Sequence, residues 1–252
     1  MTSIELFSLP GEAPDSLRGK SAVPVDVLRA GTTIITALFN GAAAVVPCVD
    51  VDTTRTLASK TERSLLGGER RGLPIKGFSL SNSPEDYRKE TVQGRCIYFS
   101  TTNGTLAIDA CRSADRILIG SFVNLTAVCE YLSRTGSDIS IVCAGTDGMP
   151  TLEDNLLGGA ICDWLNDRGN VHMNPAARAA SEMWRTTQRQ IAQGSSLCEI
   201  LCHTLGGKNL VRLNLAADIE FAATIDRFDQ VPVFDPNQGQ LRTDMDPAGT
   251  HR

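Results

Sequence analysis

Short apolar segments alternate with longer amphipathic ones along most of the chain, and this alternation limits the possible folds more than any other feature. The apolar segments are strand-like, and helical periodicity or Gly- and Pro-bearing turns follow them. Apolar strands separated by helices usually form a parallel sheet with helices on both faces. The sequence therefore predicts the α/β class, with three α/β/α layers and a mixed, largely parallel sheet. The clearest predicted strands are 22–28, 43–49, 96–100 and 138–143.

Two local signals refine this pattern. Pro24 lies inside the first predicted strand, and a proline there indicates an edge position or an irregular strand because it has no N–H to donate. Asp50 or Asp52 is expected to cap a helix that runs to about Leu66. Further helices are predicted at 32–40, 106–111, 124–134, 151–165, 174–192, 195–203 and 210–225.

We expect residues 1–252 to form a single domain. The chain is mostly helical after Gly169, so a helical C-terminal subdomain from about residue 170 is the alternative. Residues 235–252 are turn-rich, and we expect them to be loosely ordered. Nothing in the sequence decides the oligomeric state, so a homodimer remains open.

Composition excludes several classes of function. The net charge of −5 gives no basic footprint for nucleic acid. No apolar run approaches the length of a membrane span, and the N-terminus lacks the pattern of a signal peptide, so we expect a cytoplasmic protein. The eight cysteines form no CxxC pairs, which favours buried thiols over disulfides or a zinc site.

The segment 65–87 carries the densest chemistry. Glu69, Arg70 and Arg71 lie between glycines, which let a ligand approach the backbone closely. Guanidinium groups can hold a phosphate, sulfonate or carboxylate, and the carboxylate can bind a hard metal ion. Further along, Ser83 and Pro84 resemble a helix start that would direct free N–H groups at an anion, with Asn82 beside it. The alternative is a surface loop followed by a capped helix.

Three further loops share one plan, in which a polar or Gly-bearing turn joins an apolar strand to a helix. They span 26–33, 101–105 and 143–154. The carboxyl ends of parallel strands gather such loops around one crevice. An anionic substrate held with Mg²⁺ suits the combination of carboxylates, arginines, hydroxyls and amides. The predicted site comprises Asp26, Arg29, Glu69, Arg70, Arg71, Asn82, Ser83, Thr101, Thr102, Asn103, Gly104, Gly145, Glu153 and Asp154.

Several of these residues have a purely structural alternative. Asp26 could be a buried structural carboxylate, although such a group costs several kcal/mol unless it is paired. The segment 102–104 could be a tight turn only. Thr151 and Asp154 resemble a capping box, so Asp154 could serve the end of a helix. Cys143 at a strand end could be a nucleophile, but a buried thiol is the better interpretation.

In order and spacing, these motifs resemble the 2-phosphosulfolactate phosphatase (ComB) family. The resemblance covers about residues 25–159 and continues more weakly to 218–233. It implies a ComB-like fold and a Mg²⁺-dependent phosphatase that converts (2R)-phospho-3-sulfolactate to 3-sulfolactate and phosphate, a step towards coenzyme M. The matching motifs are VDVLRA with TTI, GERRGLPIKGF with SNSP, STTNGT, LIGSFVN, and VCAGTDG with LED.

The resemblance also suggests roles for the candidate residues. Asp26, Glu69, Glu153 and Asp154 are the expected metal ligands, with Arg29 and Arg70 also counted as catalytic. The expected substrate-binding residues are Arg71, Asn82, Ser83, Thr101, Thr102, Asn103, Gly104 and Gly145. Asp26 could bind the metal or attack phosphorus itself. Two other functions stay open: a phosphatase for another phosphorylated hydroxy acid or sulfonate, and a non-catalytic anion-binding module.

Overall fold

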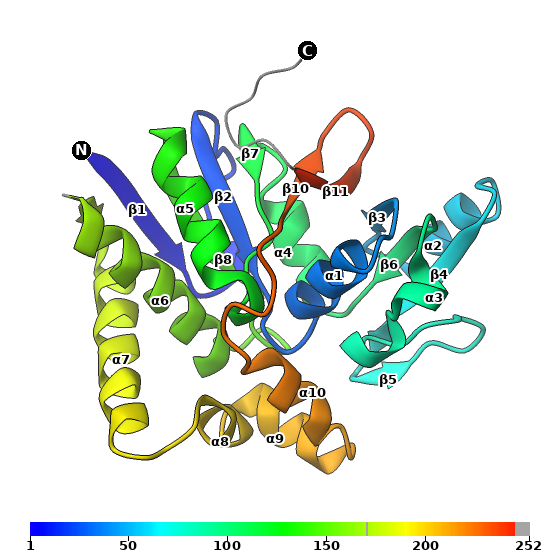
Figure 1. Ribbon diagram of the computed structural model, residues 1–252. Coiled ribbons are helices and arrows are strands. Elements are labelled where there is room, and N and C mark those ends of the chain that lie inside the picture. The colour runs from blue at the N-terminus through cyan, green and yellow to red at the C-terminus, as the bar shows by residue number, and fades with distance from the viewer. Residues whose placement is uncertain (170, 245–252) are drawn as a thin grey trace.

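The strands form two sheets. The computed structural model describes residues 1–169 and 171–244 (Figure 1). One sheet has five strands in the order β7-β2-β8-β1-β9, and all its pairings are parallel. Its members are β1 (Thr2–Phe7), β2 (Lys20–Val25), β7 (Arg116–Ile117), β8 (Asp138–Cys143) and β9 (Val171–Met173).

The second sheet has six strands in the order β10-β11-β3-β6-β4-β5. Its central strands β3, β6 and β4 are parallel, and antiparallel strands flank them. An antiparallel bridge between Leu118 and Val233 joins the two sheets. The members are β3 (Ala44–Pro47), β4 (Ser64–Arg70), β5 (Leu73–Pro74), β6 (Cys96–Ser100), β10 (Val231–Asp235) and β11 (Gln240–Asp244).

Helices cover both faces of the parallel sheet, which confirms the predicted α/β class. On one face, Leu132 of α5 and Ile161 of α6 pack against Val23 and Ile141. On the other face, α1 and α4 lie between the two sheets (Figure 1). The helices are α1 (Ala30–Phe39), α2 (Val51–Ala58), α3 (Lys89–Val92), α4 (Gly104–Ala110), α5 (Leu125–Thr135), α6 (Leu152–Arg168), α7 (Pro175–Ala192), α8 (Leu197–Cys202), α9 (Leu205–Arg212) and α10 (Ala216–Ala222).

The prediction of a helix up to Leu66 is wrong, because α2 ends at Ala58 and β4 follows. Two glycines let this strand pass close to its neighbours. A Cβ at Gly67 would lie 2.4 Å from the Tyr87 hydroxyl, and one at Gly68 would lie 2.0 Å from the Ser100 carbonyl oxygen. Close backbone approach to β6, which side-chain periodicity does not reveal, therefore decides the conformation of this segment.

The expected edge position of Pro24 is also wrong, since β2 lies between β7 and β8. The Ala22 carbonyl accepts a hydrogen bond from Leu118 on the β7 side. The nitrogen of Pro24, two residues further on, faces the same side, where β7 has already ended. The regular ladder is interrupted at Pro24 and resumes only as the isolated bridge between Val25 and Gly120, so a missing donor is tolerated there.

The end of the chain is more regular than expected over part of its length. Residues 240–244 form β11, which pairs with β10 along its length and with β3 at one position. The rest of the predicted loose tail, residues 245–252, lies outside the described residues. Among the helices that the structure describes, none is long and apolar enough to cross a bilayer.

One packing contact gives a test of the fold. Gly159 of α6 lies against α7, and a Cβ there would be 2.0 Å from the Ala180 carbonyl oxygen. We expect Gly159→Ala to lower the free energy of unfolding by about 3 kcal/mol, because overpacking against backbone forces the helices apart. Gly11→Ala is the matched control, since no atom lies within 4 Å of the added Cβ. Equal midpoints for the two variants in urea unfolding would contradict this account of the helix pair.

Candidate functional site

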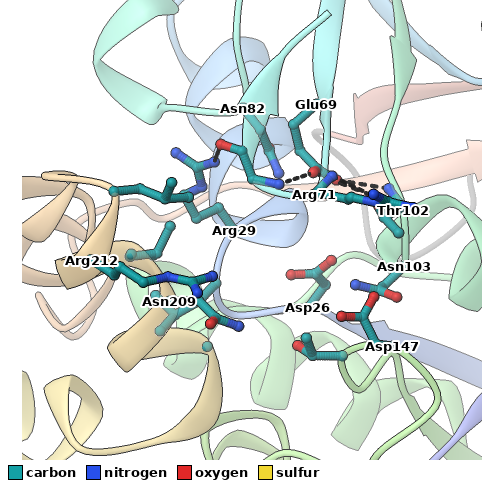
Figure 2. A pocket seen from close by; sticks show the side chains of 16 residues that line it. Asp26, Arg29, Glu69, Arg71, Asn82, Thr102, Asn103, Asp147, Asn209 and Arg212 are labelled. Atoms are coloured by element: carbon teal, nitrogen blue, oxygen red, sulfur yellow. Dashed lines mark hydrogen bonds between the residues drawn. The ribbon is translucent and has the colours of Figure 1, made fainter.

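The loops after β2, β4, β6 and β8 meet around one cavity of about 240 Å³ (Figure 2). This is the convergence that the strand ends predict. Helix α9 supplies a further wall from the C-terminal part of the chain. The cavity is lined by Asp26, Leu28, Arg29, Glu69, Arg71, Gly72, Asn82, Thr102, Asn103, Thr146, Asp147, Gly206, Asn209, Leu210, Arg212 and Leu213.

Asp26 directly follows β2 and precedes the first turn of α1. Its Oδ1 accepts a hydrogen bond from the Ala30 amide at 3.1 Å. Its Oδ2 lies 2.5 Å from the position of a Cβ at Gly104, so a larger residue there would displace the carboxylate. Burial raises the pKa of Asp26 to about 7, and the carboxylates of Glu69 and Glu153 add to the rise.

Glu69 organises the turn after β4. Its Oε1 accepts the Thr102 amide at 2.7 Å, and its Oε2 accepts the Gly72 amide at 2.6 Å. The Arg71 amide donates to the Thr102 hydroxyl at 3.2 Å. The carboxylate therefore connects the β4–β5 turn to the loop after β6 and holds Arg71 and Thr102 at the cavity.

Arg29 is bound within the protein. Its guanidinium forms an ion pair of 2.6 Å with Asp218 of α10 and donates to the Gly72 carbonyl at 3.1 Å. Ser83 donates to the other Asp218 oxygen at 2.6 Å. The charge of Arg29 is thus largely neutralised, and Ser83 serves this buried pair. Sequence reasoning did not select Asp218 as a site residue, because its partners lie 189 and 135 residues away.

The structure does not bring Arg70 into the cavity. Its guanidinium donates to the carbonyl groups of Glu69 and Val49 and to the Ser100 hydroxyl. Thr101 is also occupied elsewhere, because its hydroxyl accepts the Thr105 amide at the start of α4. Both residues support the loops that carry the neighbouring Glu69, Arg71 and Thr102.

Asp154 and Gly145 lie behind the cavity wall. Asp154 accepts the Val27 amide at 2.9 Å and the Gly145 amide at 3.0 Å. It thereby joins the loop after β2 to the loop after β8. Burial raises the pKa of Asp154 well above its usual value, and Asp26 and Glu153 raise it further. The capping-box alternative is wrong, since Thr151 makes no side-chain cap and its buried hydroxyl finds no hydrogen-bond partner within residues 1–169 and 171–244.

Glu153 faces α9. Its Oε1 accepts the Gly206 amide at 3.0 Å, whereas its buried Oε2 has no hydrogen-bond partner among the described residues. Burial raises the pKa of Glu153. Glu153 was expected to bind a metal ion, whereas its observed contact is with α9, a helix that carries no recognisable motif.

Asn82 lines the cavity, and its buried Oδ1 has no partner among the described residues. The predicted anion-binding helix start beside it does not form. Residues Pro84–Asp86 make a single 3-10 turn, η2, and Ser83 makes no side-chain cap. The short turn leaves too few free amides to act as a helix N-terminus.

Three of the cavity residues that were not predicted have charged or amide side chains, namely Asp147, Asn209 and Arg212. Asp147 lies in the AGTDG loop with φ of 50°, and its position within that motif was the only signal available. Asn209 and Arg212 belong to α9, where the sequence offers no recognisable motif. Figure 2 shows Asp26, Asn103 and Asp147 on one side of the cavity, with Asn209 and Arg212 entering from the other.

Two alternative chemistries lose support. Burial raises the pKa of the Cys143 thiol well above its ordinary value, and the nearby carboxylate of Asp154 adds to this, so no reactive thiolate is expected.

Within 1–169 and 171–244, no group of three or more His, Cys, Asp or Glu side chains is arranged to hold a metal. The four predicted metal ligands therefore do not form one ligand set.

A smaller carboxylate set still fits Mg²⁺. Asp26 and Asp147 both line the cavity, and only one Asp26 oxygen is taken by a backbone amide. Mg²⁺ commonly binds through one or two carboxylates while sharing water and substrate phosphate oxygens. Asp26 and Asp147 meet that requirement, whereas the oxygens of Glu69 and Asp154 accept amides.

A family model described as 2-phosphosulpholactate phosphatase matches residues 7–237 of the chain. The match includes all the residues that line the cavity and every strand except β11 and most of β1. It therefore confirms the resemblance inferred from the motifs.

Curated relatives support the same assignment, and each is named as a probable 2-phosphosulfolactate phosphatase. The relative from Caldanaerobacter subterraneus subsp. tengcongensis is 37% identical over 91% of this chain and 93% of its own length. The relative from Thermotoga maritima is 43% identical over 84% and 88% respectively. The relative from Symbiobacterium thermophilum is 40% identical over 89% and 95%. The expected enzyme class, a phosphoric monoester hydrolase, is thereby confirmed, and the chain belongs to the 2-phosphosulfolactate phosphatase family.

Proposed function

We propose that this protein hydrolyses (2R)-phospho-3-sulfolactate to 3-sulfolactate and phosphate and requires Mg²⁺. The observation that carries the proposal is the cavity itself. It combines carboxylates at one side with arginines that can hold an anionic substrate. Family membership supports the choice of substrate.

Asp26 and Asp147 would hold the metal ion. When bound, Mg²⁺ supplies Lewis-acid stabilisation of the phosphoryl oxygens. Water attacks phosphorus, the bond from phosphorus to the C2 oxygen of sulfolactate breaks, and that oxygen takes up a proton. The cavity residues bind and orient the phosphate ester for this displacement.

Several groups on the chain are free to contact the phosphoryl group. Asn103 lies at the start of α4 without making a side-chain cap, so its amide is available to phosphate oxygens. Arg71 lines the same cavity beside Thr102. Their hydrogen bonds would be strongest where charge develops during transfer.

Asp26 has one carboxylate oxygen that no amide occupies. This oxygen can bind the cation or attack phosphorus to give an aspartyl phosphate that water then cleaves. Both uses need the ionised form. A covalent phosphate on Asp26, detected by mass spectrometry of rapidly quenched enzyme, would identify the second route.

Replacement of Asp26 tests the proposed activity. We expect Asp26→Asn to reduce phosphate release from phosphosulfolactate by at least about 100-fold, because a carboxylate in contact with the reacting group is removed. EDTA should abolish the activity of the unmodified enzyme, and Mg²⁺ should restore it. Asp52→Asn is the matched control, since that side chain is 94% exposed on α2.

The same assay can overturn the proposal. Full activity in Asp26→Asn would remove the cavity from the reaction, and full activity in EDTA would remove the metal. Low turnover of phosphosulfolactate beside high turnover of another phosphorylated hydroxy acid would retain the site and change the substrate.

The raised pKa of Asp26 predicts how stability depends on pH. The folded state holds the Asp26 proton up to about pH 7, whereas the unfolded chain releases it near 3.8. Ionisation is therefore unfavourable for the folded state, and the cost of burying Asp26 grows as the pH rises from about 4 to 7. As the pH rises across this range, the free energy of unfolding of Asp26→Asn should increase, relative to that of the unmodified protein, by up to about 4 kcal/mol.

This comparison is made by urea unfolding in EDTA, so that no cation binds the carboxylate. The pH dependence is the readout, because a loss of packing would shift the two curves equally at every pH. Parallel stability curves for the two proteins would show that Asp26 ionises as readily when folded as when unfolded.

A further inference from the structure

Helix α9 forms one wall of the cavity and is fixed near both ends. At its start, the Gly206 amide donates to Glu153 at 3.0 Å, and a Cβ at Gly206 would lie 2.1 Å from the same oxygen. Just after its end, Leu213 Cδ1 lies 2.6 Å from the position of a Cβ at Gly72. The helix therefore bridges the loop that begins α6 and the β4–β5 turn.

One face of α9 is turned towards the cavity. Asn209 and Arg212 are three residues apart, a spacing that places both on the same side of a helix, and both line the cavity. Figure 2 shows them opposite Asp26, Asn103 and Asp147. The two contacts at Glu153 and Gly72 hold this face in place.

The arginines of the cavity differ in their partners. Arg29 is neutralised by Asp218. Arg71 and Arg212 line the same cavity, and neither forms an ion pair with any residue in the described part of the chain. Two unpaired guanidiniums thus line the cavity, and Figure 2 shows Arg71 beside Glu69 and Arg212 on the side opposite Asp26 and Asp147.

We propose that Arg212, with Asn209, binds the anionic group of the substrate that is not cleaved, so that α9 determines substrate specificity. This inference rests on the proposed function. A substrate phosphate beside Asp26 and Asp147 needs a bound cation, because the two carboxylates alone would repel it. They would likewise repel a second anionic group that no cation accompanies. A sulfonate or carboxylate on the same small molecule is therefore held on the opposite side, at Arg212.

The consequence is a preference for small phosphate monoesters that carry a second acidic group. A neutral alcohol phosphate would bind through its phosphate alone and would leave α9 uncontacted. The competing interpretation is that Arg212 only balances the dipole at the C-terminal turn of α9. That interpretation predicts the same response for both kinds of substrate.

Arg212→Gln separates the two interpretations. For phosphosulfolactate we expect KM to rise about 10- to 100-fold with little change in kcat, because a charge-assisted contact to the uncleaved group is lost. For glycerol 2-phosphate, which has no second anion, kcat/KM should stay within about twofold. Lys208→Gln is the matched control, since Lys208 is exposed on the same helix and does not line the cavity. Thermal unfolding checks that each variant is folded.

Equal losses on both substrates, or no loss on phosphosulfolactate, would overturn the inference. Binding of 3-sulfolactate, measured by calorimetry, keeps it testable apart from the proposed function. If the unmodified protein does not hydrolyse phosphosulfolactate, the proposed reaction fails. Sulfolactate binding that weakens in Arg212→Gln and not in Lys208→Gln would still support the anion site. Sulfolactate binding that is absent, or that is unchanged in Arg212→Gln, would overturn the inference.

Discussion

The buried ion pair between Arg29 and Asp218 holds the site together. Both side chains are almost completely shielded from solvent. Asp218 also accepts a hydrogen bond from Ser83, and Arg29 also donates one to the Gly72 carbonyl. Breaking such a pair typically costs about 3–5 kcal/mol, because one charge is left buried alone. The contacts tie the loop after β2, the β4–β5 turn and the segment before η2 to α10. The ion pair therefore fixes α10 against three segments that surround the cavity.

Burial of carboxylates is the second constraint on the site. Desolvation raises the pKa of Asp26, Glu153 and Asp154, and the three groups act on one another. This arrangement opposes stability at neutral pH. A cation or a set of amide donors offsets the cost, and the structure divides the carboxylates accordingly. Asp154 is satisfied by amides, whereas Asp26 keeps one oxygen free for the chemistry of the cavity.

The part of the site that could be predicted from the sequence lies at the strand ends, because strand ends gather loops. Asp26, Glu69, Thr102 and Asn103 each follow or end a strand, and all line the cavity. Arg70 was misplaced for a local reason. The segment is a strand, so neighbouring side chains point to opposite faces, and Glu69 and Arg70 cannot both face the cavity.

The remaining errors come from long-range packing. Asp218 acts through contacts with segments far away in the chain, and Arg212 reaches the cavity only because α9 packs there; no local sequence pattern indicates either arrangement. The division of the strands into two sheets likewise depends on α1 and α4 lying between them, which periodicity alone does not reveal. Asp154 was predicted to bind a metal ion, but its two oxygens accept amides from the loops after β2 and β8. Those contacts also depend on long-range packing.

The central claim is that one cavity at the strand ends binds both a divalent cation and the phosphate group. A crystal structure with Mn²⁺ and inorganic phosphate, using anomalous scattering to locate the metal, tests this most directly. The account predicts a manganese peak at the Asp26 carboxylate with phosphate beside it and near Asn103 and Arg71. Manganese and phosphate bound together on another surface, with the cavity empty, would contradict it.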